Sequence, residues 1–399
     1  MLETDSTPTP ERLTIGVAGI VDPAHAPVPT NDAERFVFRQ VFETLVRLDC
    51  AGVVRPGLAE SWQVDDDGRQ WTFTIRSDAR FSDGTPATGQ GIADSWTRRV
   101  GPLPGGTPVF TISGRELTVR LSQPVTARLF AAPGLAVTRP VEGSDWPVGT
   151  GAYAADTSGG RVTVAPFGAT GRPVLVLRPS GGGDERDLLD AGIDLLVTDD
   201  PSALGYARSR PEFTMVALPW ERRYVLAVPG GSVSLDSTVL VGLARDALRV
   251  EARPSSGIPW WADPGAVACG VAPPPGAPPL GVGTSIVALV YPAEDAVARD
   301  LAGRLVALGI GGAPRALGLA APDFSAALSS GGATGYVLPL PAVTLEACGA
   351  LRLLIARVPW LADDAARHLT PLVESRRRAI VRRGGAAFTV EWDGTLRVR

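Results

Sequence analysis

The sequence predicts an α/β protein with at least two lobes. Three observations lead to this expectation: a length of 399 residues, a hydrophobic content of 45%, and β-rich runs that alternate with helical patterns along most of the chain. A chain of this length exceeds one ordinary hydrophobic core, and this apolar content is enough to bury a sizeable one.

The first elements are a strand and a capped helix. Residues 13–21 (LTIGVAGIV) form a β-rich run that ends in the breaker DPAHAPVP. Asn31 followed by Glu34 predicts a capping box, so a helix begins there, with apolar residues at helical spacing. These residues are Val37, Phe38, Val41, Phe42, Leu45 and Val46.

The next segment predicts an antiparallel β-hairpin. In SWQVDDDGRQWTFTIR, Trp71, Phe73 and Ile75 alternate with polar residues, and Asp-Asp-Asp-Gly supplies the turn. Aromatic residues in alternation usually fill a core, so we expect these residues, together with Trp62, to be structural. A short helix is expected at 92–100.

The rest of the chain mixes strands and helices. Strands are expected at 117–121, 161–167, 174–177, 194–198, 223–229, 286–292, 335–341 and 351–361, helices at 184–191 and 294–310, and a terminal hairpin at 386–398. The basic cluster Arg376–Arg378 with Arg382 and Arg383 is expected on an amphipathic C-terminal helix. A solvated helix face explains such a cluster better than a nucleic-acid site.

Composition excludes several chemistries. The chain lacks lysine, so it has no P-loop lysine, no Schiff base and no lysine general base. Only His25 and His368 are histidines, and no Gly-x-Ser-x-Gly elbow occurs. We therefore predict no catalytic residues, no metal site and no cofactor. The net charge of -4 gives no reason to expect a nucleic-acid partner.

The cysteines and the N-terminus leave the compartment open. Cys50, Cys269 and Cys348 are read as buried small residues, with one long-range disulfide or a reactive thiol as the alternatives. The start, MLETDSTPTPER, has no export-signal pattern, and no run of eighteen apolar residues predicts a membrane span. Either the chain is cytoplasmic or an export signal was removed.

Several segments together resemble a known family. They are the end of the first strand near Asp22-Pro23, QVFETLVRLD (40–49), RPGLAESW (55–62), DDDGRQWTFTIR (65–76) and ARFSDGTP (79–86). Their order and spacing are similar to the N-terminal signature of the family 5 extracellular solute-binding proteins, the dipeptide-, oligopeptide- and nickel-binding components of ABC importers. PVGTGAY (147–153) and DLLDAGIDLL (187–196) resemble later family segments. The resemblance is good through residue 229, and the chain is shorter than the family after that point.

The resemblance implies a bilobal periplasmic-binding-protein-like fold of type II, cluster C. Lobe I would comprise residues 1–46, 149–228 and 357–399, and a β-rich subdomain, 47–148, would be inserted in it. Lobe II, shortened, would comprise 229–356.

The resemblance also implies a function. Two lobes would close over a small ligand, most simply a peptide or amino-acid-like solute, for ABC-type import. The partners would be this ligand and, if the chain is exported, a transporter permease; the protein would be a monomer, periplasmic or at the cell surface. Two alternatives stay open: a cytoplasmic relative repurposed as a biosynthetic enzyme, or a ligand sensor.

Ligand-binding candidates follow from the same resemblance. Arginine would pair with a peptide carboxylate, and an aromatic face would pack on a ligand. Asn31 is also expected as a helix cap. The candidates are Asn31, Trp220, Arg222, Arg223, Trp260 and Trp261.

Overall fold

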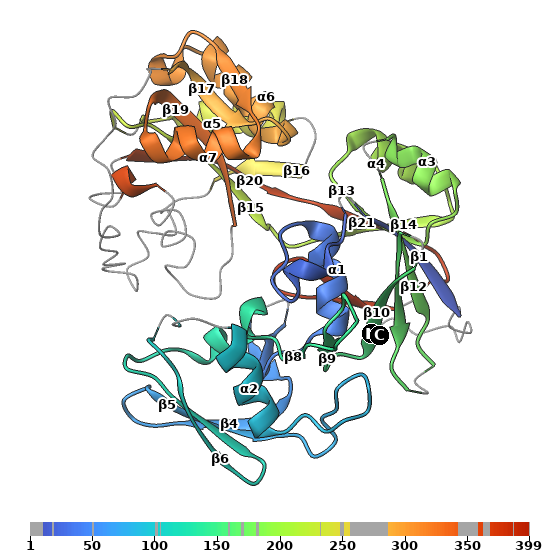
Figure 1. Ribbon diagram of the computed structural model, residues 1–399. Coiled ribbons are helices and arrows are strands. Elements are labelled where there is room, and N and C mark those ends of the chain that lie inside the picture. The colour runs from blue at the N-terminus through green and yellow to red at the C-terminus, as the bar shows by residue number, and fades with distance from the viewer. Residues whose placement is uncertain are drawn as a thin grey trace. The chain divides into compact units, whose positions relative to one another are not determined.

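The chain folds into two compact units (Figure 1). The computed structural model describes residues 11–398 except 18–19, 50–51, 100–102, 104, 159, 169–170, 181–182, 232, 248–250, 256–285, 342–357, 362–367 and 386. The first unit comprises Met1–Thr198, Ser202–Val216 and Ala379–Arg399, and the second comprises Asp199–Pro201 and Ala217–Arg378.

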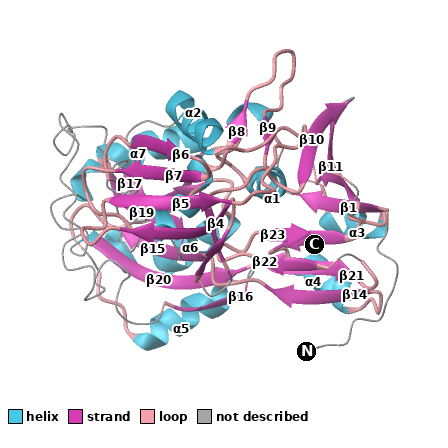
Figure 2. Ribbon diagram, turned by 90° about the horizontal axis from the view of Figure 1, so that it is seen from below, coloured by secondary structure: helices cyan, strands magenta, loops and turns pink. Residues whose placement is uncertain are grey.

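A seven-stranded sheet organises the first unit, in the order β10-β11-β12-β1-β13-β21-β14. Its strands are β1 (Arg12–Val17), β10 (Tyr153–Ser158), β11 (Arg161–Pro166), β12 (Val174–Pro179), β13 (Leu195–Thr198), β14 (Phe213–Ala217) and β21 (Arg378–Arg382). β1 is central and runs parallel to both β12 and β13. Figure 2 shows β21 beside β14. Leu189, Ala203 and Phe213 share one core, so α3 (Glu185–Asp190) and α4 (Pro201–Arg208) cover the sheet.

The helix expected after the first strand is α1 (Asp32–Val41). The Asn31 side chain accepts a hydrogen bond from the Glu34 amide at 3.0 Å, and the six predicted apolar residues are all buried, but Phe42, Leu45 and Val46 lie beyond the end of the helix. The expected terminal hairpin is β22 (Phe388–Val390) with β23 (Leu396–Val398). Gln40 of α1 donates to the Leu396 carbonyl at 2.8 Å and accepts from the Val398 amide at 3.1 Å, so α1 holds this hairpin.

A separate four-stranded sheet, in the order β4-β5-β7-β6, lies within the first unit. Its strands are β4 (Ala59–Val64), β5 (Gln70–Ile75), β6 (Val109–Ser113) and β7 (Glu116–Arg120), and α2 (Gly89–Arg99) packs on it (Figure 1). The predicted hairpin is confirmed as β4 and β5. Trp71 and Phe73 are buried against Phe130, as the alternation of polar and apolar residues predicted.

Short elements complete the first unit. They are the strand pairs β2 (Val46–Leu48) with β3 (Val54–Pro56) and β8 (Thr138–Arg139) with β9 (Val148–Gly149), and the 3-10 turns Pro23–His25, Ala127–Ala131 and Pro133–Leu135. Gly149 and Gly151 press against the end of α1. A Cβ at these positions would lie 2.0 Å from the Val41 carbonyl oxygen and 2.3 Å from the Gln40 carbonyl oxygen, so only glycine fits.

The second unit is a six-stranded sheet covered on both faces, in the order β16-β20-β15-β19-β17-β18. Its strands are β15 (Arg222–Ala227), β16 (Glu251–Pro254), β17 (Ile286–Pro292), β18 (Ala316–Leu319), β19 (Ala333–Pro341) and β20 (Leu369–Arg376). One face packs on α7 (Ala321–Ser330), through Phe324 and Leu328. The other packs on α5 (Ser237–Asp246) and α6 (Ala296–Ala307), through Leu243 and Leu301. The 3-10 turns are Ile310–Gly312 and Pro359–Leu361.

Two predictions about the C-terminal part need correction. The helix expected around Arg376–Arg378 is wrong: these residues lie at the junction of strands β20 and β21. Local spacing suggested an amphipathic helix, but pairing of β20 with the distant strands β15 and β16 decides the structure. The strand expected at 351–361 lies outside the described residues up to 357, and Pro359–Leu361 form a 3-10 turn.

The unit boundaries differ from the expected lobes. β15 and β20 were expected in lobe I, yet both lie in the sheet of the second unit, where β15 is flanked by β19 and β20. The chain therefore changes units at 216–217 and 378–379, whereas residues 228 and 357 were expected as the boundaries.

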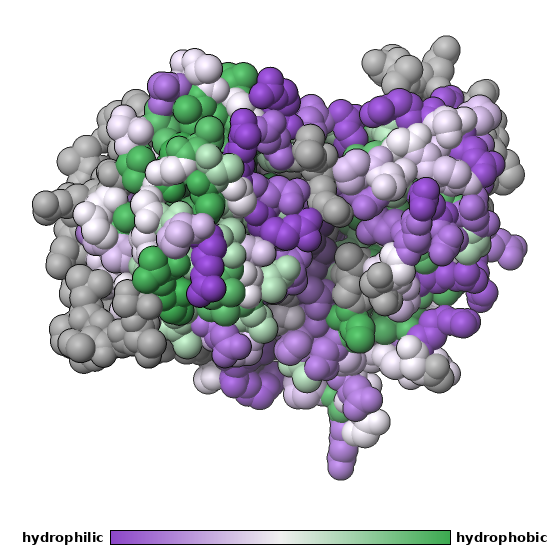
Figure 3. Space-filling model, turned by 90° about the horizontal axis from the view of Figure 1, so that it is seen from above, coloured by the Kyte–Doolittle hydropathy of each residue, from purple (hydrophilic) through white to green (hydrophobic). Residues whose placement is uncertain are grey.

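On the face of the molecule shown in Figure 3, hydrophobic side chains gather mainly on the left, with hydrophilic side chains between and beside them. Val241, Val287 and Leu308 are 56%, 54% and 44% exposed. Folded proteins usually expose some large apolar side chains. Within the described part of the chain, no helix is both long enough and apolar enough to span a bilayer.

Candidate functional site

The loop that follows β1 in the first unit is fixed by a buried carboxylate. Glu34, with no exposed surface, accepts hydrogen bonds from the Thr30 amide at 2.7 Å, the Thr30 hydroxyl at 2.8 Å and the Asp22 amide at 3.2 Å. Burial opposes ionisation, but the hydrogen bonds from Thr30, His25 and Asp22 prevail and hold the pKa of Glu34 below its usual value. The expected capping box is therefore half formed, because the Glu34 carboxylate binds the loop.

His25 is the hydrogen-bond partner of Glu34, and the two form an ion pair when the imidazole is protonated. Its Nδ1 lies 2.7 Å from the Glu34 carboxylate, and 42% of its side chain is exposed. The hydrogen bond to Glu34 raises the pKa of His25 above its ordinary value. His25 is thus an ion-pair partner within the loop and remains open to solvent.

The stability of the folded chain is expected to depend on pH through the pair of His25 and Glu34. Because the pKa of His25 is higher in the folded chain than in the unfolded chain, the protonated ring contributes its full stabilisation below about pH 6.5. This contribution is lost as the pH rises through the folded-state pKa. We expect His25→Gln to lower the melting temperature relative to wild type. This decrease should be larger at about pH 5.5 than at about pH 8.5. A difference that does not change with pH, or an equal effect in His368→Gln, would contradict the assignment.

Asn31, a predicted ligand contact, has both ends of its amide engaged. Its oxygen caps α1, and its Nδ2 donates to the Ile20 carbonyl at 3.0 Å. Asn31 therefore ties the start of the loop to the start of the helix. The capping role is confirmed, and the ligand contact stays a prediction.

The two bonds of Asn31 can be separated by substitution. Asn31→Ala is expected to lower the free energy of unfolding by about 1 kcal/mol, because it removes the cap. Asn31→Asp retains the cap acceptor and loses only the donor to Ile20, so its loss is expected to be smaller. Urea denaturation of both variants measures this, and equal losses would show that the Ile20 bond, not the cap, is the stabilising contact.

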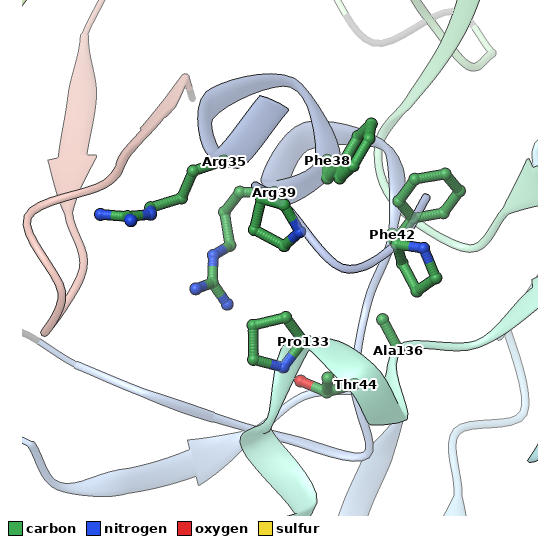
Figure 4. Close-up of a pocket in the computed structure, with 9 residues that line it drawn as sticks. Arg35, Phe38, Arg39, Phe42, Thr44, Pro133 and Ala136 are labelled. Carbon is green, nitrogen blue, oxygen red and sulfur yellow. The ribbon is translucent and has the colours of Figure 1, made fainter. Parts of the chain in front are cut away.

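A small pocket lies beside α1 in the first unit (Figure 4). Arg35 and Arg39 extend from α1 on one side of it, and the rings of Phe38 and Phe42 lie on the other. Arg39 pairs with Asp393 at 2.8 Å. The cavity of about 20 Å³ accommodates one or two waters, so in this form it is too small for a peptide.

In the second unit, the carboxyl ends of three parallel strands meet at one edge. β17 pairs in parallel with β18 and β19, and Arg222, the first residue of β15, lies opposite Pro341 at the end of β19. Ligands of open α/β sheets bind at the carboxyl edge of parallel strands. The register thus places the predicted residue Arg222 at the edge where a ligand is expected.

Charged groups surround Arg222. Burial raises the pKa of Asp199, and the positive charges of Arg222 and Arg377 act in the opposite direction. Asp295 caps α6 and accepts a hydrogen bond from the Tyr224 hydroxyl at 3.2 Å. Burial raises the pKa of Tyr224, so this hydroxyl stays protonated and donates. The edge therefore offers a guanidinium, two carboxyl groups and a phenol within one unit.

Trp220 contacts two arginines. The guanidinium carbons of Arg253 and Arg376 lie 4.3 and 4.6 Å from the centre of one of its rings. Such cation–π contacts hold the indole in place. The ring that was expected to pack on a ligand is engaged with protein groups in this form of the chain.

Arg223 is engaged as well. In the sheet it lies opposite Glu374, which in turn lies opposite Arg253, so the three side chains share one face. Glu374 is 3% exposed and accepts hydrogen bonds from both guanidinium groups, at 3.1 Å from Arg223 Nε and 2.8 Å from Arg253 Nε. Burial opposes ionisation of Glu374, but the two arginines hold its pKa below the usual value.

A second buried ion pair joins the two segments at which the chain changes units. Glu221 and Arg377 have side chains 5% and 11% exposed, and Arg377 Nη2 donates to the Glu221 carboxylate at 3.0 Å. The Leu218 amide also donates to the Arg377 carbonyl at 3.0 Å. The segments before β15 and after β20 are thereby fastened to each other.

Sequence reasoning missed Asp199, Asp295 and Glu374. Asp295 follows a predicted strand and is the second residue of the helix predicted at 294–310, so the capping pattern could have indicated it. Glu374 pairs with residues 121 and 151 positions away, and no local pattern indicates such a contact.

Trp260 and Trp261, and all three cysteines, lie outside the described residues. Among the described residues, no three His, Cys, Asp or Glu side chains come together to hold a metal ion.

Comparison with known families matches one segment closely. Residues 53–164 match the model of the bacterial extracellular solute-binding proteins, family 5 Middle. The periplasmic oligopeptide-binding protein OppA of Escherichia coli is 46% identical over 69 residues, which are 17% of this chain and 12% of that protein. The nickel-binding periplasmic protein of Escherichia coli is 34% identical over 87 residues, which are 22% of this chain and 16% of that protein. The matched segments thus span well under a fifth of each relative.

Comparison with solved structures covers nearly the whole chain. The murein tripeptide binding protein MppA of Escherichia coli superposes with a TM-score of 0.65 at 16% identity, covering 98% of this chain and 97% of that one. NikA from Brucella suis, in complex with Fe(III)-EDTA, gives 0.66 at 16% identity and covers 97% and 100%. The fold is that of the type II periplasmic binding proteins. The chain is thus similar to the family 5 extracellular solute-binding proteins over residues 53–164, and its whole fold is similar to that of solved solute-binding proteins.

Proposed function

We propose that this protein binds a small solute, a short peptide or amino-acid-like compound in the first instance, and delivers it to an ABC importer. The observation that carries the proposal is the family 5 segment, 53–164, within a chain whose fold matches solute-binding proteins from end to end. The relatives that share this segment are named for peptide or nickel binding in the periplasm. A periplasmic or cell-surface location and a permease partner belong to the same proposal.

The solute would bind at the carboxyl edge of the second unit's parallel strands. Arg222 would pair with a carboxylate of the solute, because a guanidinium offers two parallel donors to that group. Asp199 would face an amine of the solute, and Asp295 would hold the Tyr224 hydroxyl and the start of α6 beside it. Arg223 and Trp220 would act indirectly, by holding β15 in place. Arg223 does so through its ion pair with Glu374, and Trp220 through its contacts with Arg253 and Arg376. Asn31 would hold the loop after β1, and Trp260 and Trp261 remain candidates for direct contact.

A thermal-shift screen tests the proposal. Purified protein is screened against di- to pentapeptides, free amino acids, sugars and nickel ions, because a ligand that binds only the folded state raises the melting temperature. We expect a rise that is selective for peptides or amino acids. No rise with any of these classes would contradict the proposal.

A matched pair of variants locates the contact. Arg222→Gln is expected to weaken binding of the selected solute about tenfold or more, since it removes a charged hydrogen-bond donor. Arg245→Gln removes a guanidinium that is 75% exposed on α5 of the same unit, and it is expected to leave the affinity unchanged. Titration calorimetry of the two variants measures both, and equal affinities would remove Arg222 from the site.

A further inference from the structure

A short turn after β1 sets an imidazole and a carboxylate side by side. Asp22 caps the 3-10 turn Pro23–His25, where its Oδ1 accepts a hydrogen bond from the Ala24 amide at 2.9 Å. The His25 amide donates to the Asp22 carbonyl at 3.2 Å. Side chains three residues apart lie on the same side of a 3-10 turn. His25 Nε2 accordingly lies 4.0 Å from Asp22 Oδ2, and the turn presents both atoms together.

A buried carboxylate fixes the other side of the imidazole. Glu34 has no exposed surface, and its carboxylate lies 2.7 Å from His25 Nδ1. Burial opposes its ionisation, but hydrogen bonds from Thr30 and His25 hold the pKa of Glu34 below its usual value, so the carboxylate only accepts. In the neutral imidazole, Nδ1 therefore carries the proton and Nε2 the free lone pair. Histidines that bind metals are oriented in this way, by a carboxylate on the nitrogen that does not bind the metal.

The separation of the two groups suits a divalent transition-metal ion. Zinc lies about 2.0–2.2 Å from an imidazole nitrogen or a carboxylate oxygen, so two such ligands at the tetrahedral angle are about 3.4 Å apart. The observed 4.0 Å is longer by about 0.6 Å than this ideal separation. Because the side chains of His25 and Asp22 are 42% and 54% exposed, a small rotation of the carboxylate closes this difference without disturbing the core.

We infer that Asp22 and His25 bind one divalent transition-metal ion, of the zinc type, in the loop that follows β1. His25 Nε2 and Asp22 Oδ2 are the ligands, and Glu34 positions the imidazole through Nδ1. Among the described residues no third His, Cys, Asp or Glu joins them, so water completes the coordination. An imidazole ligand favours zinc over magnesium and calcium, which prefer oxygen.

This inference departs from the sequence, which predicted no metal site because the chain has only two histidines. The structure adds the turn that aligns the two ligands and the buried Glu34 carboxylate that orients one of them. The inference concerns the first unit alone and does not depend on import or on the residues around Arg222.

The two histidines of the chain make a specific test. In the full chain with histidine-selective nitrogen-15 labelling, zinc is expected to shift the Nε2 signal of His25 saturably and to leave the signals of His368 unchanged. Magnesium at the same concentrations is expected to shift neither. His25→Gln and His368→Gln assign the signals, and zinc that binds elsewhere in the chain is told apart because it does not act on His25.

A matched pair of carboxylate variants tests the second ligand. Asp22→Asn keeps an oxygen that caps the turn and removes the charged ligand. It is expected to weaken zinc binding at His25 about tenfold or more, since the loss of even an outer partner of a metal ligand costs about 10–100-fold. Asp145→Asn removes the same charge from an exposed position of the same unit and is expected to leave the affinity unchanged.

Thermal denaturation gives an independent measurement, which stays decisive if a variant folds less well. Zinc is expected to raise the melting temperature of wild type by more than that of His25→Gln, each compared with the same protein in EDTA. A rise that His25→Gln removes belongs to this turn and is distinct from solute binding. Absence of a saturable shift at His25, an equal shift at His368, or wild-type zinc affinity in Asp22→Asn would overturn the inference.

Discussion

Replacing Trp96 by alanine is expected to lower the free energy of unfolding by about 3–5 kcal/mol. Trp96 is 1% exposed, its ring lies 5.9 Å from that of Phe110 and 6.3 Å from that of Phe130, and its indole N–H donates to the Leu135 carbonyl at 2.9 Å. The substitution leaves a cavity among aromatic rings and a buried carbonyl without its donor. Urea denaturation followed by circular dichroism measures the loss.

Trp62→Ala is the matched control. Trp62 lies on β4 in the same sheet, opposite Phe73, but its side chain is only half-buried. Its loss is expected to be about 1 kcal/mol, because less apolar surface returns to water. Equal losses for the two tryptophans would show that the sheet, and not the cluster around Trp96, determines the stability of this part of the chain.

Breaking the buried ion pair in the second unit is the other large effect. Glu221→Ala leaves the Arg377 guanidinium buried without its carboxylate, and it is expected to reduce the free energy of unfolding by about 3–5 kcal/mol. The charge of Arg377 also acts on Asp199, as does that of Arg222. The shift in the denaturation midpoint, at an unchanged slope, measures this loss.

Two further variants decide whether the pair itself is responsible. Glu221→Leu combined with Arg377→Met removes both charges, and it is expected to recover most of the stability, because no buried charge is left unpaired. Glu60→Ala breaks the exposed pair with Arg115, whose side chains are 45% and 53% exposed, and is expected to lose less than about 1 kcal/mol. Strictly additive losses in the double variant would rule out coupling between Glu221 and Arg377.

Much of the fold could be predicted because its elements are encoded by local patterns. The β4–β5 hairpin follows from alternating aromatic residues around a turn, and α1 follows from a cap and apolar residues at helical spacing. The same reasoning failed at Arg376–Arg378. There an amphipathic spacing fits either a helix or a strand, and two distant strands select the strand.

The candidate site could be predicted only in part. Arg222 was a candidate because it lies on the strand expected to cross between the lobes, and only the register places it at the carboxyl edge of parallel strands; its contact with a ligand stays a prediction. That Trp220 and Arg223 are engaged with Arg253, Arg376 and Glu374 could not be predicted, because those partners come from β16 and β20.

The sequence by itself determined the resemblance to family 5, the α/β class, the core of the hairpin and the exclusion of lysine chemistry, since each depends on residue type or on neighbours in the chain. Only the tertiary structure decided where the chain changes units and which charges are paired. The physical reason is that strand pairing and buried ion pairs join residues far apart in sequence, whereas periodicity and capping act within a few residues.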